Sequence, residues 1–246
     1  MTDDGKRRWR GPKQDGGSGN SSGRRLNERK VIAHNARSES SKRWIERQLT
    51  DPYVQEAKRK GYRARAAFKL LEVDEKTKIL RPGTRVVDLG CAPGGWLQVC
   101  LEKGVKELVG IDLLPVEPVP GALIVEGDIA DEDAVGAMLQ GLTGPPDLVL
   151  SDMAANTTGH RRTDSLRTAA LAELAFDFAC AHLVEGGAFC SKVFQGGATR
   201  ELMTELKQRF RTVRHVKPPA SRAGSPELFV VAKGFRAHSG EAPGRG

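Results

Sequence analysis

The chain has 246 residues, enough for one medium-sized domain with appended segments, and 39% of them are hydrophobic. No apolar run approaches the roughly 20 residues that a membrane-spanning helix needs, and the polar N-terminus lacks the apolar region of a secretory signal. The composition therefore argues against a membrane partner. The formal net charge is +8, which favours an acidic partner.

The positive charge is concentrated in the N-terminal part of the chain. Residues 1–65 contain 18 Lys and Arg against 8 Asp and Glu, a net charge of +10, so the remaining residues sum to −2. Clustered Lys and Arg suit a polyanion, because each neutralised phosphate releases counterions. We therefore expect contact with nucleic acid, against the alternative of a tail that only increases solubility.

Composition divides the chain into three segments. Residues 1–38 are rich in Gly, Ser, Lys and Arg and bury too little apolar surface to offset chain entropy, which predicts a disordered basic leader. Residues 39–236 are expected to form the folded domain, and 237–246 a loose tail. The four cysteines form no C-x-x-C pair. This pattern favours reduced thiols in a cytoplasmic protein, with no metal site.

The domain is predicted to begin with three helical segments. Ser40-Ser41 offers an N-cap for an amphipathic segment that contains Leu49, and Asp51-Pro52 breaks it. A second, basic helical stretch runs to Gly61. A third, near residues 65–80, has apolar side chains at roughly helical spacing.

Strand and helix patterns then alternate, which predicts right-handed crossovers and a parallel sheet with helices on both faces. The strand candidates are 85–89, 107–111, 123–125, 147–151, 188–193, 212–216 and 227–233. The helix candidates are 96–103, 131–140, 165–183 and 198–210. The loop 217–226 contains no helix, so the last two strands should be antiparallel. We expect an α/β fold with a mostly parallel seven-stranded sheet and an antiparallel final strand.

The segment 86–96, with the sequence VVDLGCAPGGW, is the most informative stretch. An apolar strand ends in Asp88, a turn containing Gly90, Gly94 and Gly95 follows, and a helix then begins. The spacing differs from the dinucleotide pattern G-x-G-x-x-G, and Asp88 would repel a pyrophosphate but suit a cation. A cofactor with an adenosine end and a positively charged amino-acid end fits, and S-adenosylmethionine is such a molecule.

Further acids follow the next strands, where an open parallel sheet binds its ligands. Asp112 lies 18 residues after Gly94, near the spacing at which an acid binds a ribose diol. Asp128 could accept a hydrogen bond from an adenine amino group, and Trp96 could supply an aromatic wall. Taken singly, the acids could cap helices and Trp96 could belong to a helix core. Together they predict a Rossmann-like class I site for S-adenosylmethionine.

Four charged residues lie in or beside apolar segments. Asp152 follows the fourth strand, and Lys192 lies within the fifth, where a lysine is costly unless it is paired or functional. A buried salt bridge is the alternative for Lys192. Lys69 and Glu227, taken alone, could be ordinary surface charges.

Together these motifs resemble the FtsJ/RrmJ family (RlmE family) of ribosomal RNA 2′-O-ribose methyltransferases. The resemblance covers about residues 40–236 and rests on segments 62–70, 88–96, 112–115, 151–154, 191–194 and 225–227. The family's catalytic Lys-Asp-Lys-Glu tetrad falls on Lys69, Asp152, Lys192 and Glu227. Its cofactor positions fall on Gly94, Trp96, Asp112 and Asp128, with Asp152 at the methyl donor.

The resemblance implies methylation of a uridine ribose in the aminoacyl-site loop of large-subunit ribosomal RNA, on the assembled subunit. Two alternatives remain: a transfer-RNA or cap ribose methyltransferase that shares the tetrad, and a non-catalytic ribosome assembly factor. We expect a monomer, because no apolar interface stripe stands out. The leader is longer than the family's usual N-terminus, so the resemblance gives it no role.

The tetrad residues can be given expected roles. A lysine has an ordinary pKa of about 10.4, which burial and a second lysine lower and carboxylates raise. We expect Lys192 to act as the base, with Lys69 tuning it and orienting the hydroxyl or a phosphate. Asp152 would hold Lys192 and face the methyl donor, and Glu227 would position the lysine pair. Arg63 and Arg65, near Lys69, suggest phosphate contacts or a structural role.

Overall fold

A computed structural model describes residues 49–155, 158–195, 200–222 and 224–237. The chain divides into two compact units, residues 1–50 and 51–246. In the first unit only Leu49 and Thr50 are described, and both are helical. The predicted leader, most of the amphipathic segment after it and the tail beyond Ala237 lie outside the described residues, so the boundary at residue 39 stays a prediction.

The second unit contains a seven-stranded sheet in its described part. The strands follow one another in the order β3-β2-β1-β4-β5-β7-β6. Their bounds are β1 Arg85–Leu89, β2 Glu107–Asp112, β3 Leu123–Glu126, β4 Leu148–Ser151, β5 Ala188–Phe194, β6 Phe210–Val216 and β7 Glu227–Phe235. β7 pairs antiparallel with β5 and β6, and the other pairs are parallel. The predicted sheet and its antiparallel final strand are confirmed.

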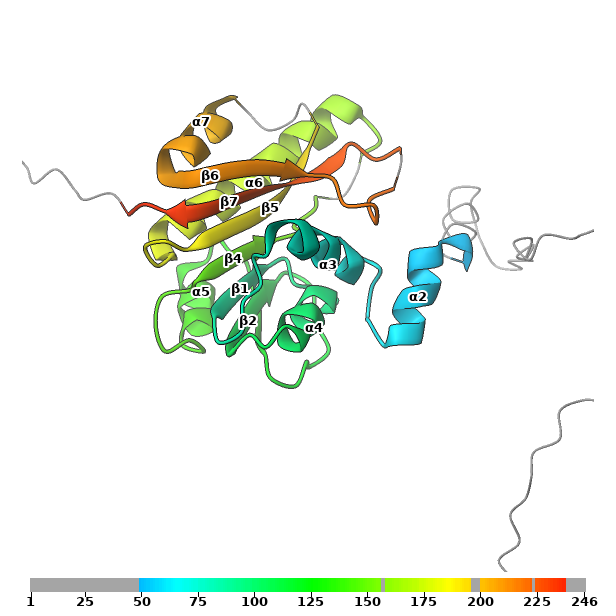
Figure 1. Ribbon diagram of the computed structural model, residues 1–246, viewed down its shortest axis with the longest axis horizontal. Coiled ribbons are helices and arrows are strands. Elements are labelled where there is room, and N and C mark those ends of the chain that lie inside the picture. Colours follow the sequence, from blue (N-terminus) through cyan, green and yellow to red (C-terminus); the bar gives the residue numbers. More distant parts are fainter. Residues whose placement is uncertain (1–48, 156–157, 196–199, 223, 238–246) are drawn as a thin grey trace, which may run out of the picture. The chain divides into compact units, whose positions relative to one another are not determined.

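Helices cover both faces of this sheet (Figure 1). The covering helices are α3 Ala66–Thr77, α4 Gly95–Glu102, α5 Glu132–Leu139, α6 Arg161–His182 and α7 Arg200–Arg209, and α2 Pro52–Lys60 lies beyond α3 (Figure 1). α3 and α4 pack on the apolar cluster that contains Val86, and α5, α6 and α7 pack on the one that contains Val87. Consecutive strand residues point to opposite faces, so these continuous apolar strands serve two cores. No helix among the described residues has the length and apolarity to cross a membrane.

Helix boundaries follow local chemistry. Asp51 caps α2, because its carboxylate accepts a hydrogen bond from the backbone N–H of Tyr53 at 3.0 Å and Pro52 follows at the first helical position. α3 ends at Thr77, earlier than the predicted residue 80, because Lys78 adopts a left-handed conformation. Asp74 then accepts a hydrogen bond from the backbone N–H of Leu80 at 2.9 Å and holds the following turn.

The topology gathers the chemically active residues at one edge of the sheet. Asp112 is the last residue of β2, and Asp152 follows the last residue of β4. Because β7 is reversed, its first residue, Glu227, lies at the same edge and pairs with Phe194 at the end of β5. Two positions away in the same register, Lys192 pairs with Phe229. Residues far apart in the sequence therefore meet where parallel strands end.

Candidate active site

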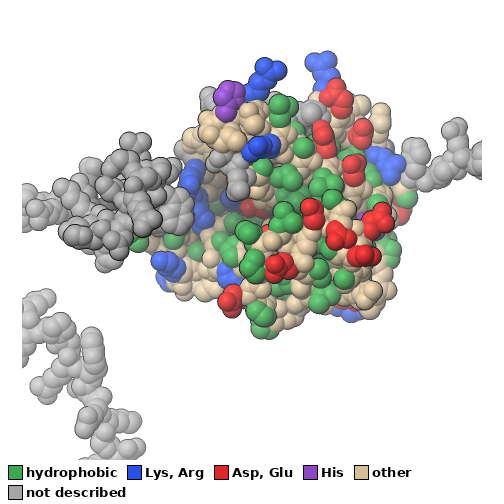
Figure 2. Space-filling model, turned by 180° about the vertical axis from the view of Figure 1, so that it is seen from behind, with side chains coloured by type: hydrophobic (Ala, Val, Ile, Leu, Met, Phe, Trp, Pro, Cys, Tyr) green, Lys and Arg blue, Asp and Glu red, His purple; other side chains and the backbone are tan. Residues whose placement is uncertain are grey.

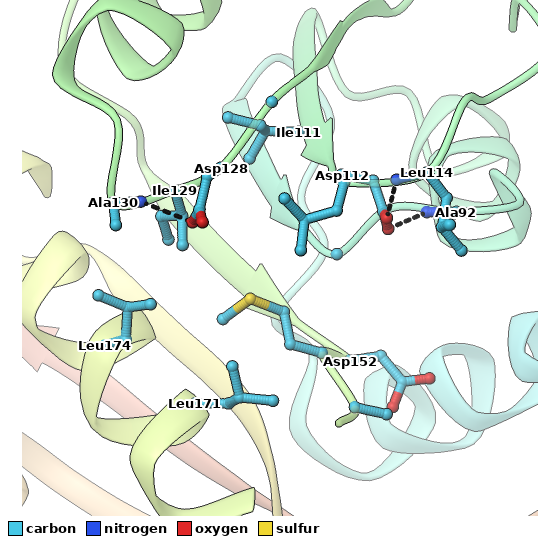
Figure 3. Close-up of a pocket in the computed structure, with 15 residues that line it drawn as sticks. Ala92, Ile111, Asp112, Leu114, Asp128, Ile129, Ala130, Asp152, Leu171 and Leu174 are labelled. Atoms are coloured by element: carbon cyan, nitrogen blue, oxygen red, sulfur yellow. Dashed lines mark hydrogen bonds between the residues drawn. The ribbon is translucent and has the colours of Figure 1, made fainter. Parts of the chain in front are cut away.

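A pocket of about 500 Å³ lies at this edge. Figure 3 shows Asp112 and Asp128 on one side of it and Leu171 and Leu174 of α6 on the other. The lining is mixed, with acidic and apolar side chains and with backbone at glycines: Gly90, Ala92, Ile111, Asp112, Leu113, Leu114, Gly127, Asp128, Ile129, Ala130, Asp152, Met153, Ala154, Leu171 and Leu174. Such a pocket can hold a flat apolar group and polar hydroxyls together.

Asp112 fixes two loops at the pocket. One carboxylate oxygen accepts a hydrogen bond from the backbone N–H of Ala92 at 2.8 Å, and the other accepts from that of Leu114 at 2.9 Å (Figure 3). Asp128 accepts from the backbone N–H of Ala130 at 3.0 Å. A carboxylate has about four acceptor positions, so both side chains can still accept hydrogen bonds from a ligand.

The turn after β1 depends on two glycines in left-handed conformations. Gly90 has φ +78° and lines the pocket, and a Cβ there would lie 2.6 Å from Cγ of Met153. Gly94 has φ +103°, and a Cβ there would lie 2.9 Å from a guanidinium nitrogen of Arg63. A side chain at either position would strain the backbone and displace its neighbour. Gly95 begins α4, where a Cβ would make ordinary contacts.

Asp88 is buried below this turn, with 1% of its surface exposed. Neither carboxylate oxygen has a hydrogen-bond partner among the described residues. Burial raises the pKa of Asp88 well above its ordinary value, and the nearby charges of Asp152 and Asp112 raise it further. A buried carboxylate without a partner needs a proton or a cation, so Asp88 suits a positively charged ligand, although it does not line the pocket itself.

Trp96 lies in the core between α4 and the sheet. Its side chain is almost completely buried, and its ring centroid lies 5.6 Å from that of Phe229. The indole N–H donates a hydrogen bond to the carbonyl oxygen of Ala66 at 2.8 Å. Trp96 therefore belongs to the helix core, which was the alternative that the sequence left open, and it does not line the pocket. Gly94 and Gly95 also lie outside the lining.

Beside the pocket, the four expected tetrad residues come together. Lys192 Nζ lies 3.1 Å from Asp152 Oδ1 and donates a hydrogen bond to the backbone oxygen of Asp152 at 2.8 Å. Lys69 Nζ lies 3.5 Å from Asp152 Oδ2 and 2.9 Å from Glu227 Oε2. Asp152 thus contacts both lysines, and because it also lines the pocket, it joins the tetrad to the pocket.

The two lysines differ in their carboxylate partners. Burial alone would lower the pKa of Lys69, but the charges of Asp152 and Glu227 outweigh burial and hold this pKa above its ordinary value. Burial alone would raise the pKa of Asp152, but Lys192 and Lys69 outweigh it and lower this pKa. Among the described residues, Glu227 forms an ion pair with Lys69, and Asp152 connects Lys69 to Lys192. The role of Glu227 in positioning the lysine pair stays a prediction.

Arg63 and Arg65 make structural contacts. The Arg63 guanidinium donates hydrogen bonds to the backbone oxygens of Pro93, Glu117 and Pro118, at 3.2 Å for Pro93 and 2.7 Å for Pro118. Arg65 forms an ion pair with Asp51 at 2.6 Å. The structure thus supports the structural role that the sequence left open for both arginines.

The pocket fits S-adenosylmethionine. Asp112 and Asp128 are spaced along one wall for hydroxyl and amino donors, and Ile111 and Ile129 provide apolar surface for a flat ring. The buried Asp88 and the pocket acid Asp152 favour positive charge. No group of three or more potential metal ligands occurs among the described residues.

Comparison with known proteins agrees with this geometry. Residues 62–235 match the family described as FtsJ-like methyltransferase. The chain is 66% identical over 236 residues to ribosomal RNA large subunit methyltransferase E of Hyphomonas neptunium. The aligned region covers 96% of this chain and 100% of that relative. It is 59% identical over 201 residues to the protein of the same name from Sphingopyxis alaskensis, covering 81% and 87% of the two chains.

A solved structure extends the likeness to the fold. A ribosomal RNA methyltransferase from Plasmodium falciparum superposes with a TM-score of 0.63 and 32% identity, over 71% of this chain and 98% of that chain. Together with the observed strand order, this likeness confirms the predicted Rossmann-like methyltransferase fold.

Sequence reasoning missed two groups of residues at the site. The apolar pocket walls, such as Ile111 and Leu174, have no motif, because any apolar residue at the end of a strand or on a helix gives the same pattern. Ser221, whose hydroxyl contacts Glu227, lies in a loop with no regular spacing. Only its position a few residues before Glu227 could have drawn attention to it.

Proposed function

Because this chain belongs to the FtsJ-like methyltransferase family, we propose that it methylates a uridine ribose of large-subunit ribosomal RNA at the 2′-oxygen, with S-adenosylmethionine as donor. The proposed target is the aminoacyl-site loop on the assembled subunit. The observation that carries the proposal is the cluster of Lys69, Asp152, Lys192 and Glu227 beside a pocket that shares Asp152.

The cofactor would be held by acidic side chains and by the turn after β1. The donor supplies a methyl group already activated on a positively charged sulfur. We assign Asp112 to the ribose diol and Asp128 to the adenine amino group, while Asp88 and Asp152 favour the cationic end. Gly90 would admit the ligand close to the backbone; Gly94, Gly95 and Trp96 would support the turn from the start of α4.

The protein's main chemical task is to remove the proton from the 2′-hydroxyl while aligning its oxygen with the methyl group. A lysine can take this proton only in its neutral form. Lys69 contacts two carboxylates, which hold it protonated, whereas Lys192 contacts the carboxylate of Asp152 alone. We therefore assign the base to Lys192, and the charged Lys69 to orienting the hydroxyl or a neighbouring phosphate.

The surface charge restricts where RNA can approach. On the face shown in Figure 2, Asp and Glu side chains gather over one area, and Lys and Arg lie mostly towards its margins. That acidic area would repel a polyanion. Lys58, Arg59 and Lys60 in the last turn of α2 offer positive charge elsewhere on the unit. The basic leader is proposed to add affinity that depends on salt but not on RNA sequence.

The decisive experiment measures transfer of labelled methyl groups to large ribosomal subunits that lack the modification, with free transfer RNA in parallel. The expected result is label at one 2′-oxygen in large-subunit RNA, mapped by a ribose-methylation assay. Label on transfer RNA alone would keep the reaction and replace the substrate. Absence of label on both would favour a non-catalytic assembly factor.

Two further parts of the proposal concern location and assembly. A ribosomal RNA substrate would place the enzyme in the cytoplasm. A monomer would suffice, because one chain supplies both the tetrad and the pocket, and sedimentation at micromolar concentration tests this. Removing residues 1–38 should weaken RNA binding and flatten its dependence on salt; an unchanged slope would contradict a role for the leader.

A further inference from the structure

One face of α3 carries more than the catalytic candidate Lys69. Arg65 at the N-cap, Lys69, Glu72 and Lys76 are spaced by four, three and four residues, which places them along one side of a helix. Three of them bind the segment 217–222, which follows β6 and leads towards β7. The helix that presents Lys69 therefore also binds the chain segment that precedes Glu227. We call the hydrogen bonds of Arg65, Glu72 and Lys76 to this segment the grip.

The grip is centred on the backbone of Ala220. Its N–H donates a hydrogen bond to Glu72 Oε2 at 2.6 Å, and its carbonyl oxygen accepts one from the Arg65 guanidinium. Lys76 Nζ donates to the backbone oxygen of Lys217 at 3.4 Å, and Ala220 is completely buried. Two charged side chains thus hold one residue from both sides, and hydrogen bonds to charged groups are among the stronger ones.

Both gripping side chains are held in turn from α2. The Tyr53 hydroxyl donates to Glu72 Oε1 at 3.0 Å, and Arg65 forms its ion pair with Asp51, the N-cap of α2. Each side chain therefore has a second partner that restricts its rotamers. Ala220 is accordingly fixed relative to α3, and so is the next residue, Ser221.

Ser221 connects this fixed loop to the tetrad. Its side-chain hydroxyl donates a hydrogen bond to Glu227 Oε1 at 2.8 Å, and Ser221 is buried with 6% of its surface exposed. The other oxygen of Glu227 accepts from Lys69 Nζ at 2.9 Å. Glu227 is therefore held between a hydroxyl from the loop and an ammonium group from α3.

We propose that Ser221 is a positioning residue of the active site, which orients Glu227 towards Lys69 and is itself placed by the grip of Arg65 and Glu72 on Ala220. This inference rests on the proposed function for its catalytic consequence. Ser221 touches neither the ribose nor the methyl donor in this scheme. It acts only through Glu227 and the charge state and direction of Lys69.

The first test compares Ser221→Ala with Ser221→Thr, which keeps the hydroxyl. Ser221→Ala should lower kcat about tenfold, the effect of one hydrogen bond to a charged group, with the KM for the cofactor within about twofold of the wild-type value. Ser221→Thr should recover most of the rate. Thr143→Val is the control, because Thr143 donates a hydroxyl bond of the same length, 2.8 Å, to Glu107 away from the tetrad. Wild-type kcat in Ser221→Ala, or an equal loss in Thr143→Val, would overturn the inference.

The second test needs no RNA and so separates this inference from the proposed function. Lysine side chains labelled with ¹³C at Cε report their own titration by NMR, with Lys69→Arg identifying the resonance. Glu227 helps to hold the pKa of Lys69 above its ordinary value, so Ser221→Ala should move that titration to lower pH, and Ser221→Thr should not. An unchanged Lys69 titration would reject the positioning role even if wild-type protein transferred methyl groups normally. A wild-type protein that transfers none would reject the proposed function and leave this test valid.

The grip itself can be tested by coupling. Glu72→Ala should lower kcat in the same direction as Ser221→Ala, because Ala220 would lose one of its two charged partners. If Glu72 acts through Ser221, the double variant Glu72→Ala/Ser221→Ala should lose little more kcat than Ser221→Ala alone. The reason is that the effects of residues that act through one another are not additive. Fully additive losses would show that Glu72 acts by another route.

Discussion

The pocket and the tetrad both depend on acidic side chains, but they balance those charges differently. Among the described residues, the pocket acids Asp112 and Asp128 accept hydrogen bonds only from backbone N–H groups, and Asp88, buried below the turn after β1, has no partner. Asp152 and Glu227 instead lie against two lysines. The tetrad is neutral by itself, whereas the pocket keeps an excess of negative charge that a cationic ligand can balance.

The contrast is sharpest between Asp88, which is buried, and Asp152, which is half-buried. The pKa of Asp88 is raised, chiefly by burial, and the pKa of Asp152 is lowered, because its lysines outweigh burial. The carboxyl group of Asp88 therefore favours its protonated form unless a cationic ligand binds nearby, whereas the carboxyl group of Asp152 stays ionised. This difference agrees with the roles proposed above, in which Asp88 favours a cationic ligand from below the turn and Asp152 pairs with the two lysines at the edge of the pocket.

The largest expected effect comes from breaking the tetrad at the proposed base. Lys192→Ala should lower kcat by about 10²–10⁴-fold, the usual contribution of a general base, while the affinity for S-adenosylmethionine stays close to that of the wild-type protein. The reason is that Lys192 does not line the pocket. Single-turnover methyl transfer and isothermal titration calorimetry measure the two quantities separately.

The matched variant for this experiment is Lys69→Ala, which removes the other lysine of the cluster. Both variants leave Asp152 with one lysine, so a general loss of charge balance should affect both alike. A smaller loss for Lys192→Ala than for Lys69→Ala would transfer the role of base to Lys69.

The next largest effect should come from the pocket. Asp112→Asn replaces one acceptor oxygen by an amide donor that faces the backbone N–H of Ala92 or Leu114. The Kd for the cofactor should rise about 10–100-fold, the range for hydrogen bonds to a charged group, with little change in kcat at saturation. Asp131→Asn is the control, because Asp131 also accepts from backbone N–H groups but does not line the pocket. Equal losses of affinity in the two variants would remove Asp112 from the cofactor site.

The sequence predicted the parts of this comparison that depend on strand ends. Asp88 and Asp112 lie at the ends of β1 and β2, and Asp152 follows β4. Parallel strands bring their ends to one edge, so the grouping follows from topology. The directions of the strands followed from the helix–strand alternation and from the helix-free loop before β7, whereas their order in the sheet was not predicted. Strand bounds differ by one or two residues, as at the start of β6 at Phe210.

The sequence could not predict which ion-pair or hydrogen-bond partner each of these side chains has in the folded protein. Glu227 forms an ion pair with Lys69, because α3 brings Lys69 to the start of β7, while Lys192 points at Asp152. Trp96 follows a glycine-rich turn, as a ligand-binding residue would, yet its indole N–H donates to Ala66. Such choices depend on how helices pack on the sheet, and a pattern of residue types contains no information about that packing.

A smaller effect should distinguish the two acids through stability. Because the pKa of Asp88 is raised in the folded state, the folded protein binds more protons than the unfolded chain, and stability falls as the pH rises above the ordinary range of a carboxyl group. Asp88→Asn cannot ionise, so the Tm of the cofactor-free variant should exceed that of the wild-type protein by an amount that grows with pH. A difference of several degrees is reasonable, since about 1 kcal/mol shifts Tm by about 2–4 °C for a domain of this size.

Asp152→Asn should behave in the opposite way. The lowered pKa of Asp152 adds stability above the ordinary carboxyl range, and this stability is lost as the pH falls through the folded-state pKa. The variant should therefore be less stable than the wild-type protein at neutral pH, and the difference should shrink in acid. Calorimetric scans from about pH 2 to about pH 9 cover both trends, because the contribution of Asp152 is lost only below the ordinary carboxyl pKa of about 4. Parallel curves for the two variants would mean that the contrast between the two acids is wrong.

The smallest expected effect concerns Arg63, which lies near Lys69 in sequence but contacts the backbone of two segments that adjoin the pocket lining. Its guanidinium joins Pro93 in the turn after β1 to Glu117 and Pro118 in the segment before β3. Arg63→Met should loosen both segments and raise the Kd for the cofactor about three- to tenfold, in line with the loss of one or two ordinary hydrogen bonds. The KM for RNA should stay unchanged, because a guanidinium that binds three backbone oxygens has few donors left for a phosphate. The opposite outcome, an increased KM for RNA with an unchanged cofactor Kd, would place Arg63 on the RNA side.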